Sequence, residues 1–172
     1  MSINIRWTAF PLHPETPAEG LLLTDLFAGR SMDIHQMMTR LRQVAREEGL
    51  ALGDRTKTYN SRLAQELGKW AEENGKGDAY HQAVFRAYFA DGRNIGEIST
   101  LLDLVKGIDL PQAEAKKIIQ NRKFQHAVDM DWARSQAMGV TSVPTFFIGG
   151  QFLVGAQPYH VLENFVGSGI TR

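Results

Sequence analysis

The chain has 172 residues, of which 43% are hydrophobic and 22% charged, and its 19 basic residues balance its 19 acidic ones. This composition is typical of a soluble globular protein of one domain, and zero net charge argues against nucleic acid or an anionic membrane as a partner. The sequence has no cysteine, which excludes disulfides, thiolate metal sites and cysteine nucleophiles within it. No apolar run reaches the roughly 18 residues of a membrane span and the N-terminus has no secretory pattern, so we expect a cytoplasmic protein.

The first predicted element is a strand over Ile3–Phe10, in which apolar and polar residues alternate so that one face would be buried. Pro11, Pro14 and Pro17 end it and predict an extended loop. The short apolar run Leu21–Leu23 that follows fits either the start of a helix or a docking segment.

Apolar residues at helical spacing then predict a series of helices before the C-terminal strands. The first helix has Ser31 as its N-cap and ends at Gly49. The others are expected over about 60–74, from 78 to about 89, over 97–106, from 111 through 119 and over about 122–138. A last helix is expected after Pro158, because proline is favoured in a first helical turn.

A β-hairpin is predicted near the C-terminus, with strands over Thr145–Ile148 and Gln151–Val154 joined by Gly149-Gly150. Proline has no N–H to donate to a ladder, so Pro144 must lie at the start of the first strand. We predict that the Val143–Pro144 bond is cis, which would present the preceding backbone to a ligand strand. The alternative is an ordinary hairpin that is entered through a trans proline.

Other chemistry has little support in the sequence. The five histidines form no spaced metal-binding pair, so we expect no metal site and no cofactor; they are His13, His35, His81, His126 and His160. Ser31 and Ser142 have no evident base and acid partners, which favours a helix cap and a loop hydroxyl over catalysis. Large apolar residues at helical spacing favour core packing, with a peptide or ligand groove as the alternative; they are Met32, Met37, Met38, Trp70, Phe85, Tyr88, Phe89 and Trp132.

An N-terminal strand, a helical region, a hairpin and a terminal helix favour one sheet with helices packed on it. Several stretches, in this order, carry a family resemblance: Ile5–Leu12 with Pro14 and Pro17–Gly20, Leu50–Asn60, Phe85–Phe89 with Gly92–Ile95, Ala133–Val140, and Ser142–Ile148 with Val154–Pro158. The ordered set resembles the FrnE-type branch of the DsbA-like thioredoxin proteins, within the superfamily of the 2-hydroxychromene-2-carboxylate isomerases.

The resemblance implies an α/β, thioredoxin-like fold with a large helical insertion. Residues 1–172 would form a single domain, with 1–20 and 140–172 as its thioredoxin part and 21–139 as the insertion. Family members begin with a further strand and a helix that starts with Cys-x-x-Cys, and this sequence lacks both. Ser142, Val143 and Pro144 are the substrate-binding residues that the resemblance implies.

Three functions are compatible with this resemblance. The family implies a cytoplasmic thiol–disulfide oxidoreductase or isomerase that acts on protein or peptide thiols, but a chain without a thiol cannot exchange disulfides. The same chain could serve as a non-catalytic module that binds an extended peptide beside the cis proline by strand addition. Related glutathione-linked isomerases and transferases are the third possibility. Whether the chain is an enzyme therefore stays open at this point.

The implied absence of a central strand also affects stability. Burying some five strand residues at roughly 2 kcal/mol each stabilises a fold by about 10 kcal/mol, while the net stability of a whole domain is only about 5–15 kcal/mol. We therefore expect that Ile3–Phe10 moves into the central position, that a second copy donates a strand, or that a separate piece fills the place. A homo-oligomer that completes the sheet is the favoured interpretation.

Overall fold

The computed structural model describes residues 3–29 and 33–170. The chain separates into two compact units, one of residues His13–Val128 and one that joins Met1–Leu12 to Asp129–Arg172. We call them the helical unit and the hairpin unit. The expected divisions after residues 20 and 139 thus lie eight and eleven residues from the observed boundaries, which follow residues 12 and 128. That both units form a single domain stays a prediction.

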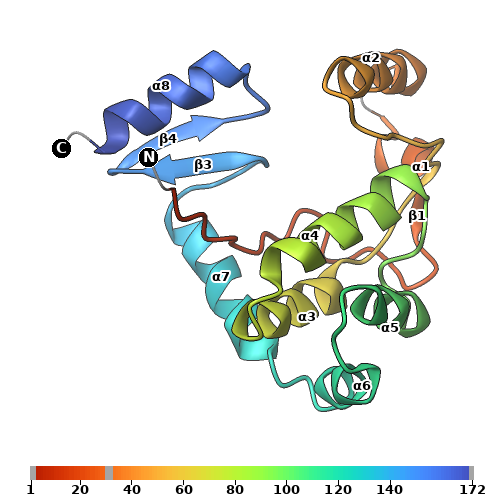
Figure 1. The fold of residues 1–172 in the computed structure, drawn as a ribbon. Helices are drawn as coiled ribbons and strands as arrows, with labels where there is room; N and C mark the ends of the chain where they lie inside the picture. The colour runs from red at the N-terminus through yellow and green to blue at the C-terminus, as the bar shows by residue number, and fades with distance from the viewer. Residues whose placement is uncertain (1–2, 30–32, 171–172) are drawn as a thin grey trace. The chain divides into compact units, whose positions relative to one another are not determined.

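The helical unit contains most of the helices (Figure 1). Its elements are β1 (Leu21–Leu22), α1 (Leu23–Leu26), α2 (Ile34–Glu47), β2 (Lys57–Thr58), α3 (Arg62–Glu73), α4 (Gly77–Phe85), the π-helical turn η1 (Arg86–Ala90), α5 (Ile98–Gly107) and α6 (Gln112–Gln120). Each predicted helix of this region is present, with ends shifted by a few residues. None of the described helices has the length and apolar character needed to span a membrane.

The start of α2 differs from the expectation. Its N-cap is Asp33, whose carboxylate accepts hydrogen bonds from the backbone N–H groups of His35 at 2.9 Å and Gln36 at 3.1 Å. Such a bond satisfies donors that have no partner inside the helix. Ser31, the predicted cap, lies outside the described residues. The run Leu21–Leu23 forms the short strand β1, which pairs with β2, and the first residue of α1.

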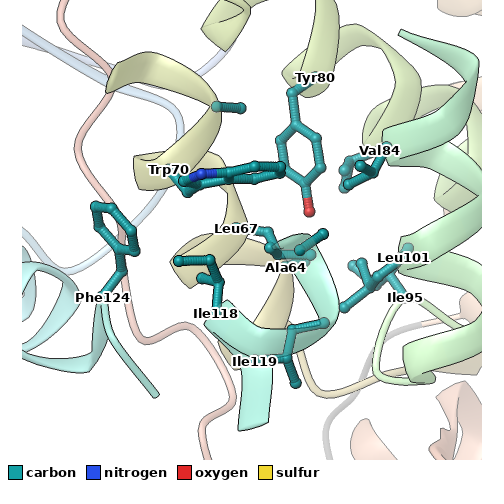
Figure 2. Close-up of a cluster of buried hydrophobic side chains, with 13 residues drawn as sticks. Ala64, Leu67, Trp70, Tyr80, Val84, Ile95, Leu101, Ile118, Ile119 and Phe124 are labelled. Carbon is teal, nitrogen blue, oxygen red and sulfur yellow. The ribbon is translucent and has the colours of Figure 1, made fainter. Parts of the chain in front are cut away.

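The core of the helical unit is formed by the apolar faces of α3, α4, α5 and α6 (Figure 2). In α3, Ala64, Leu67 and Ala71 recur at spacings of three and four residues and are all buried, which is the pattern of a helix with one apolar face. Trp70 is 2% exposed, so its predicted place in the core is confirmed. The other members of the cluster are Tyr80, Val84, Ile95, Leu101, Val105, Ala115, Ile118, Ile119 and Phe124.

A buried carboxylate, Glu66, ties α3 to the turn after α6. Its side chain is 2% exposed and accepts hydrogen bonds from Arg62 Nε at 2.7 Å and from Arg122 Nη2 at 2.6 Å. Burial alone would raise the pKa of Glu66, but the hydrogen bonds and charges of Arg122 and Arg62 outweigh it and lower the pKa. The carboxylate therefore stays ionised, and its desolvation is offset by two guanidinium groups.

The hairpin unit contains β3 (Thr145–Ile148), β4 (Gln151–Val154) and α8 (Tyr159–Ile170), and most of α7 (Gln125–Ala137) belongs to it. β3 and β4 pair antiparallel, from Thr145 opposite Val154 to Ile148 opposite Gln151. The turn residues Gly149 and Gly150 have φ values of 56° and 84°, as the predicted two-residue hairpin requires.

α8 packs against the hairpin through a glycine. A Cβ atom at Gly169 would lie 2.6 Å from the Ile148 side chain, so only glycine allows this approach without a shift. Alternation along the strands puts Phe146 and Leu153 on the same face as Ile148. The opposite face of the hairpin carries Phe147 and Phe152.

The predicted strand over Ile3–Phe10 is not formed: these residues have no regular secondary structure. The single sheet that we expected is not formed either. In the described part of the chain, β1–β2 and β3–β4 form two separate two-stranded sheets. The physical reason is that alternation predicts which side chains share a face but supplies no hydrogen-bonding neighbour. No described strand pairs with this segment, so it does not become part of a sheet.

Candidate functional site

The predicted substrate-binding residues lie in the loop between α7 and β3. Ser142, Val143 and Pro144 are all exposed, and the Val143–Pro144 peptide bond is cis, the isomer that the sequence predicts. The loop is held at its C-terminal end, where the Thr145 hydroxyl donates to the Ser142 carbonyl at 2.7 Å. The N–H of Gly155 donates to the Pro144 carbonyl at 2.8 Å, which extends the ladder by one pair.

The register of the hairpin decides which backbone groups face outward. Paired residues in an antiparallel ladder alternate between those that exchange hydrogen bonds and those that do not. The bond to the Pro144 carbonyl puts Pro144, Phe146 and Ile148 in the first class, so the N–H and C=O groups of Thr145 and Phe147 point away from β4. Within the described residues these outward groups have no hydrogen-bond partner.

We call this row of backbone groups, from Val143 through Thr145 to Phe147, the open edge. The far side of β4 is more protected, because the Gln157 side-chain amide donates to the Val154 carbonyl at 2.8 Å. An unpaired strand edge is a template for another extended chain. The open edge is therefore the place where this unit can accept a strand.

Apolar side chains surround the open edge. The Phe147 and Phe152 rings have centroids 4.8 Å apart and are 47% and 44% exposed. Val143, Phe146 and Val154 are exposed as well. Large apolar side chains gathered on a surface mark binding sites more often than single exposed ones do. An extended ligand would thus meet backbone donors and acceptors together with apolar contacts.

The family model described as "DSBA-like thioredoxin domain" matches residues 1–167 of this chain. The chain belongs to the DSBA-like thioredoxin domain family. Over 105 residues, 60% of its length, it is 32% identical to the uncharacterized protein YwbO of Bacillus subtilis (strain 168). The match spans 52% of YwbO, about half of that protein.

Solved structures support the same fold for this DSBA-like domain. The structure titled "probable DsbA oxidoreductase SCO1869" from Streptomyces coelicolor has a TM-score of 0.85 at 24% identity, with 96% of this chain and 74% of that one covered. A 2-hydroxychromene-2-carboxylate isomerase has a TM-score of 0.70 at 19% identity, with 78% of this chain and 66% of that one covered. The predicted thioredoxin-like α/β fold is thereby confirmed, while likeness at these identities says nothing about activity.

A buried acid that the sequence analysis missed anchors the start of this DSBA-like domain. Asp131 of α7 is 3% exposed and accepts the Ala9 N–H at 2.9 Å, and its second oxygen lies 3.5 Å from Arg6 Nη2. Ser135, one turn later, is also buried and donates to the Asp131 carbonyl at 2.9 Å. The signal in the sequence was a carboxylate at helical spacing between inward-facing Val128 and Ser135.

Ile3–Thr8, which precedes that anchor, is called the N-terminal segment below. Its side chains are exposed along its whole length, and the apolar ones are Ile3, Ile5 and Trp7. Among the described hydrogen bonds, none involves the backbone of Ile3, Asn4 or Ile5. The segment therefore has the alternation of a strand and lacks the neighbour that would make it one.

Neither metal binding nor serine catalysis finds support in the geometry. No group of His, Asp or Glu side chains that could hold a metal ion occurs among the residues placed by the structure. Within that same part of the chain, the Ser142 hydroxyl makes no hydrogen bond to a base. Of the aromatic residues for which core packing is predicted, Tyr88 packs against Arg55, whose guanidinium lies 4.4 Å from the centroid of the Tyr88 ring and donates to its hydroxyl. Phe85 is 45% exposed.

Proposed function

We propose that this DSBA-like domain binds an extended polypeptide by adding it as a strand along the open edge. The observation that carries the proposal is the row of unpartnered outward backbone groups at Thr145 and Phe147, next to the exposed loop Ser142–Pro144. In strand addition, main-chain hydrogen bonds supply affinity and alternate side chains supply specificity. Ser142, Val143 and Pro144 would contact one end of the bound strand, and Phe147 its middle.

The chemistry of the surroundings supports a ligand strand that turns an apolar, uncharged face to the hairpin. Phe147, Phe152 and Val143 offer aromatic and aliphatic contact area, and of the described residues from Val143 to Val154 none is charged. A charged side chain that faces Phe147 and Phe152 would therefore lose hydration without gaining a partner. Unfolded or partly folded polypeptides present the apolar, extended segments that such a site fits.

Membership in a family with oxidoreductase relatives suggests substrates that contain thiols. These 172 residues contain no cysteine, so they cannot form a mixed disulfide with a substrate. We therefore propose that this chain acts through binding, and that any thiol–disulfide exchange at the bound strand uses thiols from another segment or another protein. The FrnE-type branch and a cytoplasmic location belong to the same proposal.

The test is the binding of a fluorescently labelled polypeptide that is unfolded, reduced and alkylated, followed by fluorescence anisotropy. Thr145→Pro removes an outward N–H of the open edge and spares the ladder bonds to β4. Thr145→Val is the matched variant, because it loses the same hydroxyl contact to Ser142 but keeps the N–H. We expect Thr145→Pro to bind roughly tenfold more weakly than Thr145→Val, since one backbone hydrogen bond is lost.

Equal binding by the two variants would overturn the strand-addition proposal, and so would an absence of binding by the wild-type chain. Glutathione serves as the comparison ligand. The family likeness to an isomerase makes glutathione-linked chemistry the competing function. Glutathione is a tripeptide with charged ends, and the open edge offers it few contacts. We expect no rise in Tm with glutathione, and a clear rise would favour the competing function.

A further inference from the structure

The chain contains two parts of an unfinished sheet within one unit. One is the open edge of β3, whose outward groups at Thr145 and Phe147 have no partner among the described residues. The other is the N-terminal segment, which has no regular secondary structure and has exposed apolar side chains at alternate positions. Each part lacks what the other supplies, because a strand needs a neighbouring backbone and an edge needs a strand.

We propose that the open edge is occupied, in the absence of another polypeptide, by the N-terminal segment of a second copy of this chain. The exchange is reciprocal, so that two copies form a dimer with two identical strand additions. This inference rests on the proposed function because it uses the same edge. It adds that self-association competes with the binding of other polypeptides and keeps the edge covered.

The anchor at Asp131 explains why one copy does not complete its own sheet. Asp131 holds the Ala9 N–H at 2.9 Å and pairs with Arg6, so the end of the segment is fixed on α7. Although the segment and the hairpin belong to one unit, the ladder of β3 includes only β4 in the described structure. The remainder of the segment is left exposed, with Ile5 at 68%.

The dimensions fit such an exchange. The three residues that precede the Arg6 anchor, Ile3–Ile5, span about 10 Å when extended, and this length fits within the open edge, which spans about 16 Å from Val143 to Phe147 at roughly 3.3 Å per residue. The most exposed apolar side chains of the segment, Ile3 and Ile5, would cover part of the apolar surface beside the hairpin. Zero net charge means that two copies do not repel each other at long range.

The oligomeric state of the full chain, measured by sedimentation velocity over a wide range of protein concentration, tests this inference. The wild-type chain is expected to shift from monomer to dimer as its concentration rises. Ile5→Asp places a charge on the apolar side of the segment, and Asn4→Asp places the same charge on the other side. We expect Ile5→Asp to weaken dimerisation roughly tenfold or more, and Asn4→Asp to weaken it much less.

Thr145→Pro should weaken the dimer as Ile5→Asp does, since the two changes act on the two sides of one contact. A monomer at every concentration would overturn the inference, and so would a dimer that withstands either Ile5→Asp or Thr145→Pro. Because Ile5 is largely exposed, its substitution should leave the Tm of the monomer unchanged, which thermal melting checks.

The anisotropy assay on the Ile5→Asp variant separates this inference from the proposed function. Because Ile5→Asp weakens the docking of the competing segment, polypeptide binding by this variant should stay intact or become tighter. If the wild-type chain is monomeric but binds the polypeptide, the dimer inference fails and the proposed function stands. If the chain dimerises as expected but monomeric Ile5→Asp binds no polypeptide, the proposed function fails and the dimer inference stands.

Discussion

The helical unit and the hairpin unit satisfy their backbones in different ways. In the helices α3 to α6, most N–H and C=O groups bond within their own helix, and the apolar faces meet in a core where Leu67 and Leu101 are fully buried. In the hairpin, each strand has a neighbour on one side only among the described residues, and Phe147 and Phe152 stay nearly half exposed. Helices therefore need neighbours only for their side chains, whereas strands need them for their backbones as well.

The sharpest way to test this difference is to remove one large side chain from each unit. Leu67→Ala should lower the free energy of unfolding by about 3 kcal/mol, because Leu67 is fully buried and a cavity would remain. Phe152→Ala should cost less than about 1 kcal/mol, since Phe152 is 44% exposed. Urea denaturation of both variants measures the two values. Equal losses would mean that the hairpin face is covered in solution, as a dimer would cover it.

The buried ion pairs of the helical unit are the next target. Glu66→Gln leaves the guanidinium groups of Arg62 and Arg122 without their carboxylate and should cost about 2 kcal/mol at neutral pH. Glu72→Gln, which removes a more exposed carboxylate from the same helix, is the matched control and should cost well under about 1 kcal/mol. Chemical denaturation at neutral pH compares the two, and similar costs would contradict the role given to Glu66.

The same pair predicts a pH dependence. The pKa of Glu66 is lower in the folded chain than its ordinary value of 4.5, so the unfolded chain binds the proton more readily. The contribution of Glu66 is therefore complete above about pH 4.5 and is lost as the pH falls through the folded-state pKa. The wild-type chain should lose stability over this range more steeply than Glu66→Gln does, and parallel curves would contradict the prediction.

The smallest expected effect concerns Tyr80, which is 1% exposed and whose hydroxyl has no hydrogen-bond partner in the described structure. Figure 2 shows this oxygen among the apolar side chains of the core. Tyr80→Phe removes a buried polar group that is not paired, so stability should stay unchanged or rise by up to about 1 kcal/mol. Tyr88→Phe is the contrasting variant, since the Tyr88 hydroxyl contacts Arg55 and Thr58. It should lower stability by about 1 kcal/mol, and thermal melts rank both variants against the wild type.

Much of the helical unit could be predicted from the sequence. The spacing of apolar residues located its helices, and it placed Trp70 in a core where the structure has it. It missed Glu66 and Asp131, because a charged residue at a core position can be recognised only with its partner. The partner of Glu66 is Arg122, 56 residues away in the chain, and that of Asp131 is the Ala9 N–H, 122 residues away.

The candidate site also has features that the local sequence predicts and features that it does not predict. The Gly149-Gly150 turn, both hairpin strands and the position of Pro144 could be read from local residue types, because turn geometry depends on residues that are adjacent in the chain. The strand predicted over Ile3–Phe10 was wrong for a complementary reason. Its alternation is real, but a strand exists only as part of a ladder, and the local sequence contains no information about the neighbour.

The helices, the hairpin, the family and the absence of a thiol can be read from the sequence alone, since these depend on local spacing and composition. Three features can be seen only in the folded chain. The hairpin keeps an open edge, Gln157 protects the far side of β4, and Asp131 fixes Ala9 on α7. These features depend on which distant segments come together and which do not. Backbone pairing between segments is satisfied or left open only once the chain has folded, and the open edge, with the polypeptide binding that we propose for it, arises at that level.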